Sequence, residues 1–563
     1  MSIGWKALAV AAALVLTGAQ APPPMGRIEY TFTPVMQGGA LQAMQVDLRF
    51  RGEADGETGL RLPQEWGGQS ELWRSVEAVE AVSGATLTED GPARRVLTHR
   101  PSARIHVRYR IVQDFEGAPN ARQGNAYRAV VQPTYFHFIG DAVLITPEAH
   151  PQATPVRVRM RGLPRGWSYA SDLEHRPLAL GNVWASVTVG GDFRIVERRD
   201  QQVRVAMRGA WRFEDDAFVD QVAEIIGGQR RFFGDGPSPY LVTVMQLESP
   251  QEGWLSLGGT GLSDAFAFFA TDNAEAAQIT RTLAHEGLHS WIPGRIGGQP
   301  DEDEAANYWL SEGFTDFFTG RVLVREGLWT PQQFAADLNR MLAEYASSPV
   351  REAPNARILA DFWNDRAVRQ LPYQRGRLLA SIWDAQLRAS GRDLDDVVLA
   401  MRDRARDGDP LKAAEMFPLV ARTFGLDPEA MIETNIVAGA PIVLPEDVFA
   451  PCGRVVTRDV AEFHRGFDIE ATQANNNVIA GVDPSLPAYA AGLRDGMILL
   501  RREGGEIGNS ELEIGYVVRD GDAERTIRYM PQGRGRFRLQ QLEIAPALAG
   551  ETLARCVAIL GGA

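Results

Sequence analysis

The residues best suited to catalysis are two histidines four positions apart, with a glutamate directly after the first. His285, Glu286 and His289 form the motif His-Glu-Gly-Leu-His. On a helix, positions i and i+4 lie on the same face, so both imidazoles can reach one ion. Glu286 lies about 100° around the helix from His285, where its carboxylate can contact a water on the ion without binding the ion. The spacing therefore predicts a zinc site with a general base beside it.

A third ligand is available downstream, in the segment Trp-Leu-Ser-Glu-Gly-Phe-Thr-Asp-Phe-Phe. Glu312 and Asp316 are four positions apart there and share a helix face. One carboxylate can complete the ligand set, while a second one hydrogen-bonds a ligating histidine and fixes its tautomer. We therefore predict His285, His289 and Glu312 as the ligands of one zinc ion, with Asp316 behind them. The alternative is that both histidines lie on a helix surface with ordinary hydrogen-bond partners and bind no metal. The apolar leucines beside the motif argue against this alternative.

The zinc motif must lie on a helix for this geometry to form. Asp272 and Glu275 resemble a capping box that begins this helix, and we expect the helix to run to Trp291, before a Pro-Gly pair. A second helix carries Glu312 and ends near Gly327. A third begins at a Thr-Pro-Gln-Gln capping sequence, and its apolar face consists of Phe334, Leu338, Met341, Leu342 and Tyr345.

The rest of the chain changes pattern twice. Residues 27–207 alternate apolar and polar side chains, as in the stretch 104–111, which is typical of a half-solvated antiparallel sheet or sandwich. Helical periodicity follows, and a Pro-rich linker at 440–453 precedes further strand-like segments. We predict a multidomain α+β protein with an N-terminal antiparallel β domain at 26–208, a mainly helical catalytic domain at 209–440 and a third domain at 441–563.

The zinc motif and the downstream glutamate resemble those of the gluzincin metallopeptidases, and most of all the glycyl aminopeptidase family. The resemblance implies an N-terminal β domain, a thermolysin-like catalytic domain and a C-terminal PDZ domain. It also implies one zinc ion on His285, His289 and Glu312, with Glu286 as the general base. In this clan a Tyr three residues before a Gly donates to the oxyanion, and Tyr373 fits that pattern. The alternative is that Tyr373 is a buried phenol that packs against neighbouring leucines and has no catalytic role.

A glycine-rich segment precedes the zinc helix and departs from the family pattern. It contains Gly258, Gly259 and Gly261 but lacks the glutamate that binds the free α-amine of the substrate in related aminopeptidases. Asp264 is the nearest carboxylate, in a shifted register. The backbone of the segment can still align a peptide as an added strand. The sequence thus leaves open whether the enzyme is an aminopeptidase or an endopeptidase.

The C-terminal region resembles a PDZ domain, with Gly466, Phe467, Asp468 and Ile469 at the place of the carboxylate-binding loop. Backbone N–H groups of such a loop capture peptide C-termini. The alternative is a PDZ-like fold that only packs on the catalytic domain. Cys452 and Cys556 bracket this region. They form either a disulfide or two separate thiols.

The N-terminus and the charge bear on the compartment and the partners. Residues 1–21 place one lysine before a short apolar run and small residues, which predicts a signal peptide and an exported protein, periplasmic or secreted. The apolar run is well short of the roughly twenty residues that a stable membrane span needs. The 58 Lys and Arg against 72 Asp and Glu give a net charge of −14, which argues against nucleic acid as a partner.

These features together predict an exported zinc metallopeptidase acting on peptide or protein substrates, with peptide C-termini as further partners of the PDZ-like domain. One alternative is a peptide-binding scaffold with a vestigial zinc site, which the intact Glu286 argues against. Another is a zinc hydrolase acting on a substrate other than a peptide.

Overall fold

The computed structural model describes residues 26–562, except 175–176, 251–253, 301 and 547. The predicted signal peptide at 1–21 lies outside the described residues. Within the described ranges, no helix combines the length and the apolar character needed to cross a membrane.

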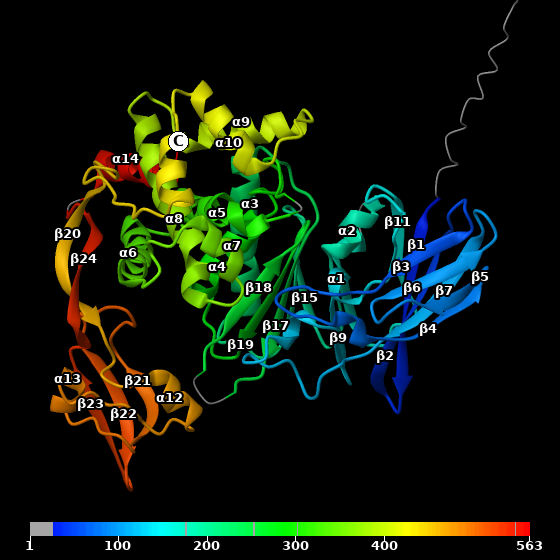
Figure 1. The fold of residues 1–563 in the computed structure, drawn as a ribbon, viewed down its shortest axis with the longest axis horizontal. Helices are drawn as coiled ribbons and strands as arrows, with labels where there is room; N and C mark the ends of the chain where they lie inside the picture. Colours follow the sequence, from blue (N-terminus) through cyan, green and yellow to red (C-terminus); the bar gives the residue numbers. More distant parts are fainter. Residues whose placement is uncertain (1–25, 175–176, 251–253, 301, 547, 563) are drawn as a thin grey trace, which may run out of the picture.

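Three sheets form the N-terminal β domain (Figure 1, blue to cyan). Their pairing is antiparallel apart from one parallel pair, β1 with β11. In β7 apolar residues are buried and alternate with charged ones, so the predicted period-two pattern is confirmed. The strands in sheet order are β13 (Leu178–Ala179), β11 (Pro155–Met160), β1 (Ile28–Gln37), β2 (Ala40–Arg51), β7 (Arg104–Ile111) and β4 (Val76–Ser83); then β10 (Thr146–Pro147), β3 (Glu57–Arg61), β6 (Arg94–His99) and β5 (Ala85–Glu89); then β12 (Ser168–Ser171), β14 (Val187–Gly191), β9 (Tyr135–Ile139) and β8 (Val130–Gln132).

A separate five-stranded sheet begins the catalytic region. Its order is β15 (Arg194–Arg198), β16 (Val203–Arg208), β17 (Tyr240–Leu247), β19 (Ala265–Thr271) and β18 (Leu257–Gly261). Strands β16, β17 and β19 are mutually parallel, whereas β15 and β18 are antiparallel edge strands. The predicted domain boundary at 208/209 falls inside this sheet, after β16. β15 and β16 continue the alternating pattern of the β domain, but they hydrogen-bond into the sheet that follows.

The two faces of this sheet bury different partners. Ala206, Met245 and Phe269 join the core of the β domain, while Val205, Val244 and Phe268 pack in the core that holds the following helices. Because successive side chains of a strand point to opposite faces, one sheet can close both cores. The zinc helix is thus anchored to a sheet whose other side rests on the β domain.

The helices cover one side of this sheet and form the largest core (Figure 1, green to yellow). The predicted capping box at Asp272 is wrong by one turn: the N–H of Glu275 bonds to Gln278, and the zinc helix ends at Leu288, before Trp291. Thr330 accepts from the N–H of Gln333 as predicted. The helices are α3 (Asp215–Phe233), α4 (Ala276–Leu288), α5 (Tyr308–Arg325), α6 (Pro331–Ser347), α7 (Asn355–Asp361), α8 (Arg366–Arg388), α9 (Leu394–Arg406) and α10 (Ala413–Thr423).

The region predicted as one domain at 441–563 has two parts. An apolar core of its own, which includes Phe467, Leu493 and Tyr516, holds α12 (Ile469–Ala474), α13 (Pro487–Ala490), β21 (Ile498–Glu503), β22 (Ile514–Asp520) and β23 (Ala523–Tyr529). The flanking β20 (Gly453–Phe463), β24 (Gln532–Ile544) and α14 (Gly550–Gly561) bury side chains in the core of the catalytic helices instead. Asn339 on α6 bonds both the N–H and the carbonyl of Leu542 on β24. The predicted boundary therefore separates strands and a helix from the core in which they are buried.

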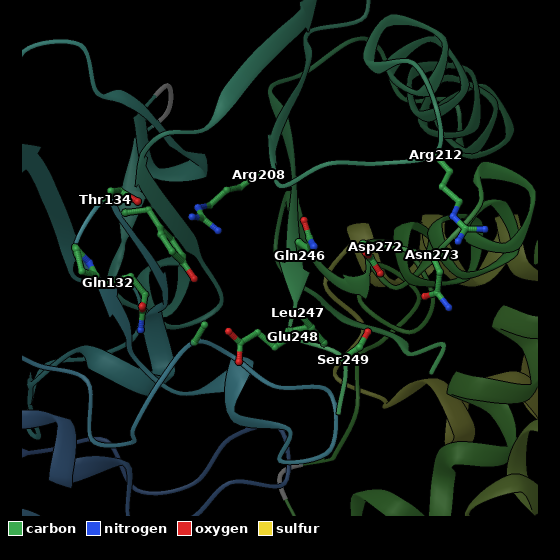
Figure 2. Close-up of a pocket in the computed structure, with 13 residues that line it drawn as sticks. Gln132, Thr134, Arg208, Arg212, Gln246, Leu247, Glu248, Ser249, Asp272 and Asn273 are labelled. Carbon is green, nitrogen blue, oxygen red and sulfur yellow. The ribbon is translucent and has the colours of Figure 1, made fainter. Parts of the chain in front are cut away.

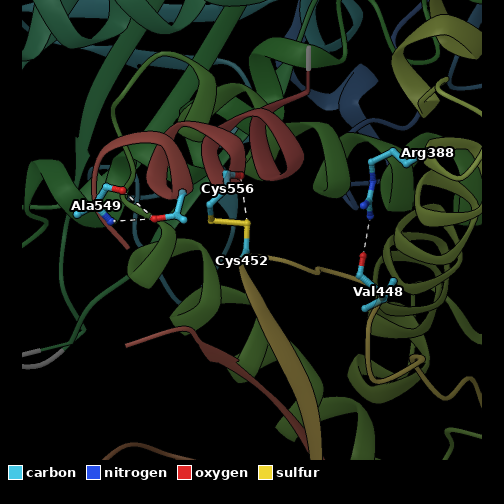
Figure 3. Close-up of a disulfide and its surroundings, with 6 residues drawn as sticks. Arg388, Val448, Cys452, Ala549 and Cys556 are labelled. Atoms are coloured by element: carbon cyan, nitrogen blue, oxygen red, sulfur yellow. Dashed lines mark hydrogen bonds between the residues drawn. A yellow bond between two sulfur atoms is a disulfide. The ribbon is translucent and has the colours of Figure 1, made fainter. Parts of the chain in front are cut away.

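Cys452 and Cys556 form a disulfide that joins the start of β20 to α14 (Figure 3). Both cysteines are fully buried, with their Cα atoms 4.7 Å apart. Nearby, Arg388 on α8 donates to the carbonyl of Val448, which attaches the preceding segment to the helices (Figure 3). The disulfide therefore lies at the base of the C-terminal region, on the catalytic helices.

Removing this disulfide is expected to destabilise the catalytic helices together with the paired strands β20 and β24. The bridge closes a loop with a sequence separation of 104. For the Cys452→Ala/Cys556→Ala double variant we expect the free energy of unfolding of this region to fall by about 2–5 kcal/mol. Urea unfolding followed by tryptophan fluorescence measures this, and reduced wild type is the control for loss of the bond alone. An unchanged urea midpoint would contradict the expectation.

Candidate active site

Two helix faces meet at the predicted zinc motif. On α4, Arg281 and His285 lie one turn apart, and His289 follows directly after the helix. On α5, Glu312 and Asp316 lie one turn apart in the same way. Because i and i+4 positions line one face, the two faces meet along a seam of ion pairs and hydrogen bonds.

The predicted ligands converge on one point. The potential ligand atoms of His285, His289 and Glu312 all lie within 4.8 Å of one another. The Nε2 atoms of His285 and His289 lie 3.2 and 3.4 Å from Oε2 of Glu312. The Nδ1 atoms have other partners: Asp316 at 2.8 Å for His285, and the carbonyl of Ile292 at 3.0 Å for His289. Both imidazoles are thus held so that Nε2 faces the shared point.

The donor set fits zinc. Two imidazole nitrogens and one carboxylate oxygen are ligands that zinc prefers, and each histidine has an outer hydrogen-bond partner. Burial lowers the pKa of His285, but its hydrogen bonds to Asp316 and Glu312 outweigh burial and raise the pKa to about 10. Burial acts against ionisation of Glu312, yet His289 and His285 hold its pKa well below the usual range. Glu312 is therefore an anion that draws cations to this point.

Glu286 lies beside the cluster, against the glycine-rich strand. The N–H of Gly261 on β18 donates to the Glu286 carboxylate. Burial raises the pKa of Glu286, and the two histidines only partly oppose this shift. A Cβ at Gly261 would lie 3.1 Å from the carbonyl oxygen of Glu286 and 3.2 Å from Cβ of His289, so glycine lets the strand approach the zinc helix. A carboxylate with a raised pKa is suited to accept and return a proton.

Tyr373 reaches the cluster because α5 and α8 cross closely. A Cβ at Gly376 on α8 would lie 1.8 Å from the carbonyl oxygen of Trp309, so only glycine allows this approach. One turn earlier, the ring of Tyr373 stacks on His285 with centroids 5.8 Å apart. Burial, and then the charges of Glu312 and Glu286, raise the pKa of Tyr373 well above its usual value. The phenol therefore keeps its proton and is a hydrogen-bond donor.

Two residues outside the predicted set also contact this region. Tyr127 of the β domain donates to the carbonyl of Gly259, 3.0 Å away, and fixes the glycine-rich strand from the opposite side. Arg281 contacts Asp316 at 2.8 Å. In the sequence, the only signal for a role of Arg281 at this site is its position one turn before His285. Asp264, the nearest carboxylate to the missing glutamate, forms an ion pair with Arg295, so its charge is already compensated.

A wide cleft lies away from the metal cluster (Figure 2). It encloses about 840 Å³ between the β domain and the five-stranded sheet, and its lining includes Thr134, Arg208, Gln246, Glu248 and Asp272. None of the predicted metal ligands lines it. The convergent ionisable groups, and not this cleft, mark the candidate active site.

The predicted peptide-carboxylate loop differs from the expected form. The N–H of Gly466 bonds to His464, and that of Asp468 bonds to the carbonyl of Ala480. The Asp468 side chain then caps α12, so Ile469, the last residue of the predicted loop, is the first residue of a helix. The buried ring of Phe467 belongs to the core of this module. Two of the four amides predicted to bind a carboxylate are thus already bonded within the protein.

Comparisons with known proteins find a family match over the metal cluster and a similar fold. Residues 278–368, which hold all three predicted ligands, match the model of the M61 glycyl aminopeptidase family. An aminopeptidase N family protein from Idiomarina loihiensis has the same fold, with a TM-score of 0.68 and 15% identity over 95% of this chain and 100% of that one. An M1 zinc metallopeptidase from Deinococcus radiodurans, as a variant bound to a Tyr-Ser-Ala substrate, matches with a TM-score of 0.48 and 16% identity over 75% of this chain and 96% of that one. No curated protein matches the sequence significantly. The family match over the metal cluster and the shared fold together support a gluzincin-type zinc peptidase.

Proposed function

We propose that the protein is a zinc-dependent metallopeptidase that hydrolyses peptide bonds with Glu286 as its general base. The observation that carries this proposal is the convergence of His285, His289 and Glu312 within 4.8 Å, with the Glu286 carboxylate beside them. The family match over 278–368 supports it independently.

The side chains around the cluster divide the chemistry between them. Zinc held by His285, His289 and Glu312 would supply an acidified water and polarise the scissile carbonyl. Glu286 would accept a proton from the water that attacks the carbonyl carbon, and would give a proton to the departing amine as the C–N bond breaks. The Tyr373 hydroxyl donates a hydrogen bond to the negative charge that develops on the carbonyl oxygen.

The edge strand β18 offers a place for the substrate. Among the described strands it pairs only with β19, so an extended peptide can add along its other edge, where the Gly259 carbonyl already accepts from Tyr127. Gly258, Gly259 and Gly261 keep this strand free of side chains that would hold the peptide away, and Gly261 contacts the general base. A peptide in this position runs past Glu286 and the metal cluster.

A mixed peptide library with free and blocked N-termini tests the proposal and the mode of cleavage. The mature chain and its Glu286→Ala variant are incubated with the library, and the products are read by mass spectrometry. Internal cuts in blocked peptides that the variant does not make would establish an endopeptidase. Removal of single residues from free N-termini would establish an aminopeptidase. Absence of cleavage by both proteins would refute the proposal and favour a peptide-binding role for the C-terminal module.

Replacing Tyr373 by Phe is expected to lower kcat with little change in KM. The ring and its stacking on His285 remain, while the hydroxyl that stabilises the oxyanion is lost. By analogy with the loss of one oxyanion donor, we expect kcat to fall by about 10²–10³-fold. Steady-state kinetics with a peptide substrate measures this, and Tyr345→Phe on α6 is the matched phenol control. If Tyr373 only packs, its Phe variant will retain full kcat.

We also propose that the chain is exported, on the strength of the signal-peptide pattern at 1–21 and of the two cysteines that an oxidising compartment allows to pair. Cell fractionation followed by N-terminal sequencing tests this. Recovery of an uncleaved chain from the cytosol would contradict it.

A further inference from the structure

A chain of alternating charges leads from the metal cluster into the protein. Nδ1 of His285 and Nη2 of Arg281 each lie 2.8 Å from the same oxygen of Asp316. Nε of Arg281 lies 2.9 Å from Asp337, whose other oxygen is 2.7 Å from Nη1 of Arg377. The sequence of contacts is therefore His285, Asp316, Arg281, Asp337 and Arg377.

Four helices contribute to this chain, so its geometry depends on how they pack. Arg281 and His285 belong to α4, Asp316 to α5, Asp337 to α6 and Arg377 to α8. The side chains of Asp316, Asp337 and Arg377 are 5%, 6% and 2% exposed. Charges at such depth destabilise a protein unless each has a partner, and here every one of them has a partner.

The partners also set the charge at the cluster. Arg281 and Arg377 compensate Asp316 and Asp337, so the negative charge beside the histidines comes from other carboxylates, with Oε2 of Glu312 3.2 Å from Nε2 of His285 and 3.4 Å from Nε2 of His289. Without Arg281, Asp316 would lose one of its two close ion-pair partners and keep His285, with the charge of Arg377 near by.

We propose that Arg281 is a positioning residue for the metal centre. It fixes the Asp316 oxygen that accepts from Nδ1 of His285, and so keeps Nε2 of His285 directed at the ion. Because Arg281 and His285 lie one turn apart on α4, guanidinium and imidazole reach one oxygen together. This inference rests on the proposed zinc site, and it predicts that zinc affinity depends on a residue that does not contact zinc.

Zinc affinity of the full chain, measured by competition with a chromophoric chelator, tests the proposal. Loss of an outer hydrogen bond to a ligand typically weakens metal binding about 10–100-fold, and we expect this loss for Arg281→Met. Arg281→Lys keeps the charge but not the fork that spans two carboxylates, so a smaller loss is expected. Arg340→Met is the matched control, because Arg340 lies 3.8 Å from Asp337 and is 62% exposed. The visible spectrum of the cobalt-substituted proteins reports the ligand geometry independently of activity.

Each outcome separates this inference from the proposed function. Wild-type zinc affinity and an unchanged cobalt spectrum in Arg281→Met would overturn the inference. Zinc binding by the wild type without peptidase activity would refute the proposed function alone. If thermal unfolding shows that metal-free Arg281→Met does not fold, Asp337→Asn removes the far anchor of Arg281 instead. Weaker zinc binding by that variant would support the inference, and unchanged binding would overturn it.

Discussion

The Glu286→Gln variant is expected to bind zinc as tightly as the wild type and to lose nearly all turnover. Glutamine fills the same volume beside Gly261 but cannot accept a proton. General acid–base catalysis contributes about 10²–10⁴-fold to the rate, so we expect kcat to fall by that factor. Because His285, His289 and Glu312 are untouched, the zinc content should not change.

Metal analysis and steady-state kinetics on the same preparation measure both quantities. Glu275→Gln, at the exposed start of the same helix, is the matched control and should leave kcat and zinc content unchanged. A Glu286→Gln protein that retains turnover would show that another group takes the proton. One that loses zinc would show that Glu286 binds the metal directly.

The His289→Ala variant is expected to lose both zinc and activity. Nε2 of His289 is one of three ligand atoms, so the alanine variant keeps only two of them. The Glu312 carboxylate also loses its contact with His289. Zinc affinity should fall by more than the about 10–100-fold that an outer hydrogen bond contributes. Activity should disappear with the metal.

Chelator competition and peptidase assays at matched free zinc separate the two losses. His464→Ala, in the C-terminal module, is the matched histidine control, since its Nδ1 accepts only from the N–H of Gly466 in the described structure. Excess zinc should restore part of the activity of His289→Ala if the remaining two ligands still bind. Full activity at wild-type zinc levels would exclude His289 as a ligand.

Much of the active site follows from local sequence, because it depends on spacing within single helices. The positions of His285 and His289 on one face, and of Glu312 and Asp316 on another, are set by the 3.6-residue turn. The capping sequence at Thr330 and the alternation in β7 are likewise local, and the structure confirms both. Such features are set by neighbours in the chain.

Which sheet or core each strand and helix joins depends on residues distant in sequence, so only the tertiary structure decided it. The hairpin β15 and β16 looks like part of the β domain, but its hydrogen bonds join it to β17. β20, β24 and α14 follow the predicted linker, yet their apolar side chains enter the core of the catalytic helices. A period of two shows that a strand is present. It does not show which sheet edge the strand joins, because that depends on which free edge and which apolar face it meets.

The same distinction applies within the site. The spacing of one helix predicts that His285 can bind a metal, whereas the contact of Arg281 with Asp316 and Asp337 requires α4, α5 and α6 to pack together. Asp264 has its charge compensated because Arg295 lies beside it in space. The sequence alone thus determined the residues that can perform the chemistry. The tertiary structure determined which charges around them are paired, because burial makes every charge depend on a partner that only packing supplies.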